Sequence, residues 1–159
     1  MTNIQCIFLD LDGVFADFKK RFREIVKFEY DTDPAGAWSR LDQVDHLFLT
    51  LEPFPEAKQM FNSIINTGVP CKMLTALPRT TGKLKTAAAD KAEWVARHLS
   101  PDIEVICTDG WRGKRLYAKS DAILIDDMQR NIDDWREGGG IGIRHTDPAD
   151  TLMKLAAYI

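Results

Sequence analysis

The chain begins with an apolar run that ends directly in carboxylates. Residues 4–18 read IQCIFLDLDGVFADF. The run before Asp10 is continuous rather than alternating, which is typical of a strand covered on both faces. Asp10, Asp12 and Asp17 then follow within eight positions. Burying an unpaired charge is costly, so these acids are expected to hold something at the end of a buried strand.

Short apolar runs of the same kind recur along the chain. We predict core strands at 4–9, 69–74, 103–107, 122–125 and 140–143. Stretches with helical spacing of apolar residues lie between them, at 55–66, 84–99, 132–136 and 148–158. Strand and helix in alternation predict an α/β fold, a parallel sheet flanked by helices.

Residues 17–52 interrupt this alternation. They contain the helical patterns FKKRFREIVKF and WSRLDQVDHLFLTL but no convincing core strand. We therefore predict a core domain formed by residues 1–16 and 53–159, with a small helical cap, residues 17–52, inserted after the first strand. Asp17 is interpreted as the N-cap of the first cap helix rather than as a metal ligand.

Bulk properties exclude several classes of protein. The net charge of −3 provides no basic footprint for duplex nucleic acid or an anionic membrane. No apolar segment is long enough to span a bilayer, and the first residues do not resemble a signal peptide. Cys6, Cys71 and Cys107 lie in predicted strands as small buried apolar residues, which suits a cytoplasmic protein.

Two acid pairs stand at the ends of predicted strands. Residues two apart on a strand point the same way, so Asp10 and Asp12 share a side. Asp126 and Asp127 end the strand AILIDD. Ligands of open α/β sheets lie beyond the carboxyl ends of the strands, where all four acids are expected to meet. Because converging carboxylates repel one another, a hard divalent cation such as Mg²⁺ is predicted among them.

Two further residues suit phosphate chemistry at this edge of the sheet. Thr75 ends the strand VPCKMLT, and Lys114 lies between the third strand and the acidic one. A carboxylate can attack phosphorus to form an acyl-phosphate, while a second acid transfers the proton of the leaving oxygen. Thr75 and Lys114 would supply a hydroxyl and a positive charge to the phosphoryl oxygens. Lys119 competes with Lys114 for the latter role.

Each motif alone is weak, and the argument depends on their conjunction in this order. A DxDG stretch also partly fits a calcium loop, but the third oxygen ligand and the closing Glu are missing at their usual spacing. A lone strand-end Thr or a lone Lys would be unremarkable. Acid pair, Thr, Lys and acid pair, each at the end of a strand, together favour a phosphoryl-transfer site.

The set of motifs resembles a known superfamily. FLDLDGVFADF, KMLTA, GKRLYA and ILIDD are similar to the four motifs of the haloacid dehalogenase (HAD) superfamily of phosphotransferases. More narrowly, the chain resembles the 5'(3')-deoxyribonucleotidases and their phage and bacterial relatives, also through KAEWVARHL and LIDDMQRNIDDWREGGGIGIRHT. The resemblance covers nearly the whole chain, is weakest in residues 19–45, and implies a Rossmann-like core.

The resemblance implies a role for each motif residue. Asp10 matches the nucleophile and Asp12 the general acid/base. Thr75 matches the phosphate-binding Thr, and Lys114 the Lys that neutralises the phosphoryl group and the nucleophile. Lys114 is preferred to Lys119 because it stands just before LYA, as the family Lys commonly does.

The resemblance also implies a Mg²⁺ site and a substrate pocket. The metal ligands are the carboxylate of Asp10, the backbone carbonyl of Asp12, and the strand-end pair. In that pair Asp127 is favoured as a direct ligand and Asp126 as a direct or water-mediated one. The substrate-binding residues are Thr75, Lys114, Ala76, and two aromatic residues that enclose a nucleobase, Phe18 and, more loosely aligned, Trp38.

The chain departs from the nucleotidase pattern in ways that concern the substrate. Ala76 stands where a hydroxyl often touches phosphate, and Met128 where an Arg is common. The insertion is also shorter than in the animal nucleotidases. These departures do not change the residues that match the catalytic motif positions.

The main hypothesis is a Mg²⁺-dependent phosphomonoesterase that hydrolyses deoxyribonucleoside monophosphates through an aspartyl-phosphate. Another small phosphate ester, or a polynucleotide 3'-phosphate, is the alternative substrate, the latter disfavoured because no basic groove is visible in the sequence. A receiver-type phosphoacceptor domain is a further alternative, and a non-catalytic binding module is disfavoured. The sequence leaves the oligomeric state open.

Overall fold

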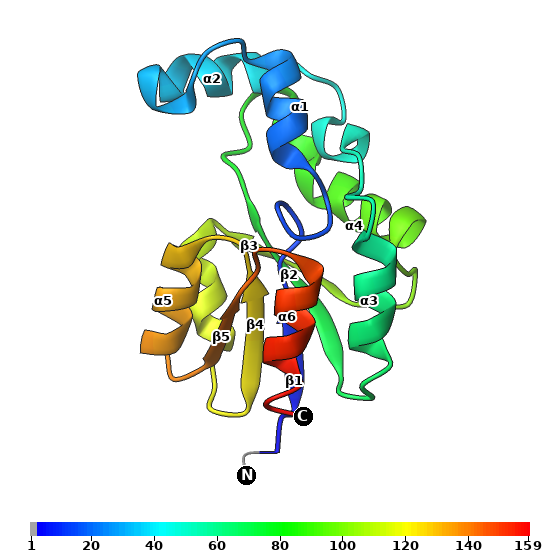
Figure 1. Ribbon diagram of the computed structural model, residues 1–159. Coiled ribbons are helices and arrows are strands. Elements are labelled where there is room, and N and C mark those ends of the chain that lie inside the picture. The colour runs from blue at the N-terminus through cyan, green and yellow to red at the C-terminus, as the bar shows by residue number, and fades with distance from the viewer. Residues whose placement is uncertain (1–2) are drawn as a thin grey trace.

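Residues 3–159 are described by a computed structural model, in which five parallel strands form one sheet (Figure 1). The strand order is β3-β2-β1-β4-β5, and each neighbouring pair is parallel. The strands are β1 (Cys6–Leu9), β2 (Cys71–Leu77), β3 (Val105–Asp109), β4 (Ala122–Asp126) and β5 (Ile141–Arg144). The predicted parallel α/β fold is confirmed, and all five strands lie within three residues of their predicted bounds.

Both faces of the sheet are covered, which explains the continuous apolar runs. Alternate residues of β1 enter different clusters: Ile7 and Leu9 join the large core, whereas Phe8 joins a smaller one on the other face. In the smaller cluster Phe8 meets Trp135 of α5 edge-to-face, with the ring centroids 5.5 Å apart. A strand buried on both faces has no polar side to alternate with its apolar one.

The core helices are α3 (Ala57–Ile65), α4 (Ala87–His98), α5 (Gln129–Glu137) and α6 (Pro148–Leu155). The stretch predicted as one helix from residue 84 begins as a 3-10 helix, Gly82–Thr86, before α4. A longer 3-10 segment, Trp111–Tyr117, connects β3 to β4.

The segment 17–52 is helical, as predicted. It contains α1 (Phe18–Ile25) and α2 (Pro34–Leu41), with 3-10 turns at Tyr30–Thr32 and Leu47–Thr50. In Figure 1, α1 and α2 lie beyond the carboxyl ends of the strands. Asp17 is the N-cap of α1, where its Oδ1 accepts from the backbone N–H of Lys20 at 3.0 Å, so this prediction is confirmed.

The strand order excludes the receiver-type alternative. Receiver domains have the flavodoxin-like order 2-1-3-4-5, whereas this sheet has the Rossmann-like order 3-2-1-4-5. The order reverses between β1 and β4, and ligands of such sheets bind at the carboxyl ends of the strands on either side of this switch point. The hypothesis of a receiver domain is therefore wrong, and the site is expected where β1 and β4 end.

The three cysteines are free and lie in β1, β2 and β3, but they are half-buried rather than fully buried as expected. Burial raises the pKa of all three thiols, that of Cys71 to about 12. Within residues 3–159, no helix is long and apolar enough to cross a membrane.

Candidate active site

The end of β1 and the end of β4 bring three carboxylates together. Leu9 of β1 pairs with Ile125 of β4, so the next residues, Asp10 and Asp126, stand side by side. With Asp127 they form a cluster in which one oxygen of each lies within 4.8 Å of the others. Asp10 and Asp126 are buried, and Asp127 is half-buried.

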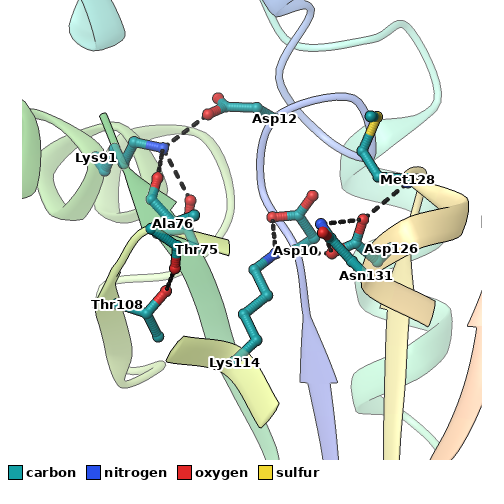
Figure 2. A network of polar contacts seen from close by, with 11 residues as sticks. Asp10, Asp12, Thr75, Ala76, Lys91, Thr108, Lys114, Asp126, Met128 and Asn131 are labelled. Carbon is teal, nitrogen blue, oxygen red and sulfur yellow. Dashed lines mark hydrogen bonds and ion pairs between the residues drawn. The ribbon is translucent and has the colours of Figure 1, made fainter. Parts of the chain in front are cut away.

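Lys114 is the cation of this cluster. Its Nζ donates to Asp10 Oδ1 and to Asp126 Oδ2, each at 2.7 Å, and the side chain is only 3% exposed (Figure 2). Burial alone lowers the pKa of Lys114, but the carboxylates of Asp10 and Asp126 outweigh it and raise that pKa. The competing Lys119 is exposed, so the structure places Lys114, as preferred, among the acids.

One lysine does not balance three acids. Burial, followed by repulsion from Asp126, raises the pKa of Asp10 well above its usual range. The same two causes raise the pKa of Asp127 to about 6. Carboxylate oxygens that crowd together and resist ionisation are a donor set that suits a hard divalent cation.

The two strand-end acids differ in what already holds them. Asp126 accepts from Lys114, from the Asn131 side-chain amide at 2.9 and 3.1 Å, and from the Met128 backbone N–H at 2.9 Å (Figure 2). Asp127 accepts no hydrogen bond from another side chain within residues 3–159. Its carboxylate is therefore the more available of the two for a metal ion.

Gly13 holds the loop after β1 against Asp127. Its φ is +85°, and an added Cβ would lie 2.2 Å from Asp127 Oδ2. Both facts favour glycine, because side chains strain a left-handed backbone and no space exists here for a methyl group. The glycine of DLDG is therefore required by the acid cluster as well as by the turn.

We expect Gly13→Ala to displace Asp127 and to weaken the binding of a divalent cation by the three carboxylates about 10- to 100-fold, the cost of disturbing a metal site through its supporting contacts. Calorimetric titration with Mg²⁺ measures this affinity. Gly68→Ala is a matched control, since Gly68 also has a positive φ of +79° but no atom within 4 Å of an added Cβ. Equal losses in the two variants would indicate backbone strain alone.

Asp12 is held by a lysine that the sequence analysis missed. Lys91 of α4 is 1% exposed, and its Nζ donates to Asp12 Oδ2 at 2.7 Å, to Thr75 Oγ1 at 2.9 Å and to the Ala76 carbonyl at 3.0 Å (Figure 2). The other oxygen, Asp12 Oδ1, is buried without a hydrogen-bond partner among the described residues. Lys91 thus fixes one oxygen of Asp12, and the other makes no hydrogen bond within residues 3–159.

A signal for Lys91 was present in the sequence. In KAEWVARHL, Lys91 falls on the apolar stripe of the helix, four residues after Ala87 and three or four before Trp94 and Val95. These three residues are buried, and a lysine within a buried stripe needs a partner. Asn131, which holds Asp126, carried no comparable signal.

Two neighbouring cavities, which share five lining residues, adjoin the acids. One of about 260 Å³ lies over Asp10, Asp127, Thr75 and Lys114. The second, of about 240 Å³, leads away between core and insertion. Both cavities are lined by Asp12, Phe18, Ala76, Trp111 and Arg130.

Aromatic rings from both parts of the chain surround the second cavity. Phe18 and Trp38, predicted from the sequence, line it together with Phe48, and the rings of Phe18 and Phe48 stack with centroids 6.0 Å apart. Trp111 lines it from the core, with the Arg130 guanidinium 5.0 Å from its ring centroid. Neither Trp111 nor Arg130 was predicted. Trp111 belongs to the 3-10 connection between β3 and β4, and Arg130, in the first turn of α5, was given no site role although it lies in the quoted stretch LIDDMQRNIDDWREGGGIGIRHT.

The sequence matches no protein-family model and no curated protein. Solved structures are similar to it. A haloacid dehalogenase-like hydrolase from Streptococcus pneumoniae matches over 99% of both chains, with a TM-score of 0.64 and 14% identity. Another from Xanthomonas campestris matches over 99% of this chain and 96% of its own, with a TM-score of 0.65 and 11% identity.

A HAD family hydrolase from Deinococcus radiodurans, solved with bound phosphate and sodium, covers 99% of this chain and 90% of its own, with a TM-score of 0.53 and 12% identity. At these identities the similarity shows the fold. The Rossmann-like HAD core that the sequence resemblance implied is thereby confirmed, while the roles of the individual site residues stay predictions.

Proposed function

We propose that this chain, which has the fold of HAD hydrolases, is a Mg²⁺-dependent phosphomonoesterase that acts on deoxyribonucleoside monophosphates through an aspartyl-phosphate on Asp10. The observation that carries the proposal is Lys114, a buried lysine held between two of three clustered carboxylates at the switch point of the sheet. Phosphoryl transfer needs fixed positive charge beside the oxygens of the transferring phosphoryl group.

Each residue has a place in the reaction. Asp10, oriented by Lys114 through Oδ1, attacks phosphorus with its other oxygen and displaces the ester oxygen, to which Asp12 gives a proton. Asp12 then takes a proton from water, which attacks the acyl-phosphate, releases inorganic phosphate and regenerates Asp10. Thr75 and Lys114 bind the phosphoryl oxygens. Lys91 is a positioning residue, since it reaches Asp12 and Thr75.

The carboxylates of Asp10 and Asp127 and the backbone carbonyl of Asp12 would hold Mg²⁺, with Asp126 acting through water. The existing hydrogen bonds of Asp126 support this division. Bound Mg²⁺ would neutralise the carboxylates and the phosphoryl oxygens.

The lining of the cavity between core and insertion favours a substrate whose leaving group carries a nucleobase. It is lined by rings from three separate segments, and aromatic side chains stack on any base. We assign residues 17–52 as the cap that closes it. Ala76 has no hydroxyl for phosphate, and its backbone carbonyl accepts from Lys91. Arg130 lines the catalytic cavity together with Met128, which stands where the family often has an Arg. A cytoplasmic location belongs to the same proposal.

The proposal is tested by a phosphate-release screen with and without Mg²⁺. The substrates are deoxy- and ribonucleoside monophosphates with 5'- or 3'-phosphate, sugar phosphates and nitrophenyl phosphate. We expect turnover only with Mg²⁺ and the highest kcat/KM with deoxyribonucleotides. If sugar phosphates were hydrolysed faster than every nucleotide, the proposed nucleotide specificity would be wrong. If no ester were hydrolysed, the proposed phosphatase activity would be wrong.

Asp12→Asn should impair proton transfer and spare the metal site. The variant retains the backbone carbonyl, so the rate should fall by about 10²–10⁴-fold, the usual contribution of a general acid. The loss should be smallest for nitrophenyl phosphate, whose leaving group needs no proton. Steady-state rates over a series of leaving groups measure this, and an equal loss for all of them would argue against the acid role.

Phe18→Leu should affect nucleotides selectively. The change keeps apolar bulk against Phe48 but removes one stacking face, which is worth about 1–3 kcal/mol per base in single-strand binders. We expect a lower kcat/KM for deoxyribonucleotides and little change for nitrophenyl phosphate. Phe61→Leu, the same change at a buried core ring that lines neither cavity, is the matched control. An equal fall for both substrates would mean that Phe18 supports the fold or the catalytic loop.

A further inference from the structure

A groove of about 420 Å³ lies between α1 and the segment that follows it, and residues 19–30 supply its whole lining. Three cations line it: Lys19 and Arg23, one helical turn apart on α1, and Lys27, just after the helix. One acid, Glu29, lines it as well. The groove therefore carries net positive charge on a chain whose total charge is −3.

These cations differ from their neighbours on the same helix. Lys20 pairs with Glu52, and Arg21 pairs with Glu24. Lys19, Arg23 and Lys27 form no ion pair within residues 3–159. Their charges are thus available to an anion that enters the groove.

The groove adjoins the candidate active site at one residue. Lys19 lines both the groove and the cavity over Asp10 and Asp127. A substrate whose terminal phosphate lies at Asp10 can therefore extend past Lys19 towards Arg23.

Aromatic rings follow the same path. Phe18, which lines the catalytic cavity, has its ring centroid 6.2 Å from that of Phe22, and Phe22 is 6.2 Å from Tyr30. Phe22, Phe28 and Tyr30 line the groove beside the cations. A positive track combined with a row of aromatic side chains is how proteins bind single-stranded nucleic acid.

We propose that this groove binds the nucleotides adjoining the terminal phosphate of a short single-stranded oligonucleotide, whose phosphate is removed at Asp10. The inference rests on the proposed phosphatase activity and extends its substrate class. Lys19, Arg23 and Lys27 contact successive backbone phosphates, and the rings of Phe22 and Tyr30 contact bases. Sequence-independent contacts of this kind accept any base, so the groove sets substrate length rather than sequence.

The test compares thymidine 3'-monophosphate with the 3'-phosphorylated di-, tri- and tetranucleotides, and with the 5'-phosphorylated series. For one of the two series we expect kcat/KM to rise about tenfold or more as the groove fills, as one stacked base would provide. In Arg23→Gln/Lys27→Gln the ratio of trinucleotide to mononucleotide should fall towards one. Arg97→Gln/Lys154→Gln, which removes the same charge from exposed sites on α4 and α6, should leave the ratio unchanged.

Binding provides a second readout that does not need turnover. Fluorescence anisotropy of a labelled 3'- or 5'-phosphorylated tetranucleotide is followed with the Asp10→Asn protein at several salt concentrations. Adding Arg23→Gln/Lys27→Gln to the Asp10→Asn protein removes two of the proposed phosphate contacts. The slope of log affinity against log salt should then be smaller by roughly 1–1.5 than for Asp10→Asn alone.

If mononucleotides were hydrolysed and kcat/KM did not rise with oligonucleotide length, the proposed role of the groove would be wrong, whereas the proposed phosphatase activity would stand. A gain that survives in Arg23→Gln/Lys27→Gln would also overturn the proposed role of the groove. Displacement of the strand by inorganic polyphosphate as effectively as by unlabelled strand would show a general polyanion surface instead. If no phosphate ester is hydrolysed at all, the proposed function itself fails.

Discussion

Asp10→Asn is expected to abolish phosphate release while the protein stays folded. The substitution keeps the size of the side chain but removes the attacking charge, and losing a nucleophile typically costs roughly 10⁴-fold or more in rate. Because burial and Asp126 raise the pKa of Asp10, its charge is unfavourable in the metal-free fold. Removing that charge relieves repulsion within the cluster, so the melting temperature of the metal-free variant should equal or exceed that of the parent.

The measurement pairs phosphate release with thermal unfolding in the absence of metal. Asp102→Asn, a change of the same type at an exposed loop position, is the control and should alter neither value. Trapping phosphate on the parent enzyme by rapid acid quench should yield a labelled protein that Asp10→Asn does not form. Near-normal turnover by Asp10→Asn would mean that another group attacks phosphorus.

The parts of the site that the sequence predicted are those with a local signal. Asp10 and Asp126 follow directly on runs of apolar residues, and the parallel pairing of β1 with β4 then leaves the two acids no position except side by side. The period of a strand and the rule for the carboxyl ends of strands suffice for this step. Strand bounds and the α/β class were predicted for the same reason.

The residues that were missed have no sequence pattern that marks them as part of the site. Asn131 reaches Asp126 from the first turns of α5, and Trp111 reaches the cavity from a 3-10 connection. Lys91 differs, because its place on an apolar stripe was visible but looked like an ordinary helical lysine. Only the structure shows that it touches Asp12 and Thr75, residues 79 and 16 positions away in sequence.

The basic groove shows why summed charge is a poor guide to a local surface. The sequence FKKRFREIVKF mixes paired and unpaired cations, and adjacent letters such as Lys19 and Lys20 point in different directions on a helix. Folding pairs Lys20 with Glu52 and leaves Lys19 beside the acid cavity. The absence of a visible basic groove in the sequence therefore did not exclude one in the fold.

Lys114→Met should produce the largest loss of stability of any change in the site. Lys114 separates two carboxylates whose side chains are 9% and 0% exposed, Asp10 and Asp126. Methionine fills a similar volume but leaves both acids uncompensated, and breaking a buried ion pair in this way costs about 3–5 kcal/mol. The free energy of unfolding of the metal-free protein, measured by urea at pH 7.5, should fall by that amount.

The pH dependence separates lost charge from lost packing. Lys114 lowers the pKa of Asp10, which burial and Asp126 raise, so without Lys114 the pKa of Asp10 rises further in the folded state. The folded variant then binds more protons than the unfolded chain at mildly acidic pH. Stability then rises as pH falls, and the difference from the parent should be smaller at pH 5.5 than at pH 7.5. Mg²⁺ should likewise stabilise the variant, because it binds the folded acids and not the unfolded chain.

Lys119→Met is the matched control, since the exposed Lys119 should change the free energy of unfolding by no more than about 0.5 kcal/mol. A loss in Lys114→Met that stayed the same from pH 7.5 to pH 5.5 would assign Lys114 a packing role only. It would also remove the main support for the phosphoryl site, because a lysine that does not compensate Asp10 and Asp126 in the free protein has no reason to be buried between them.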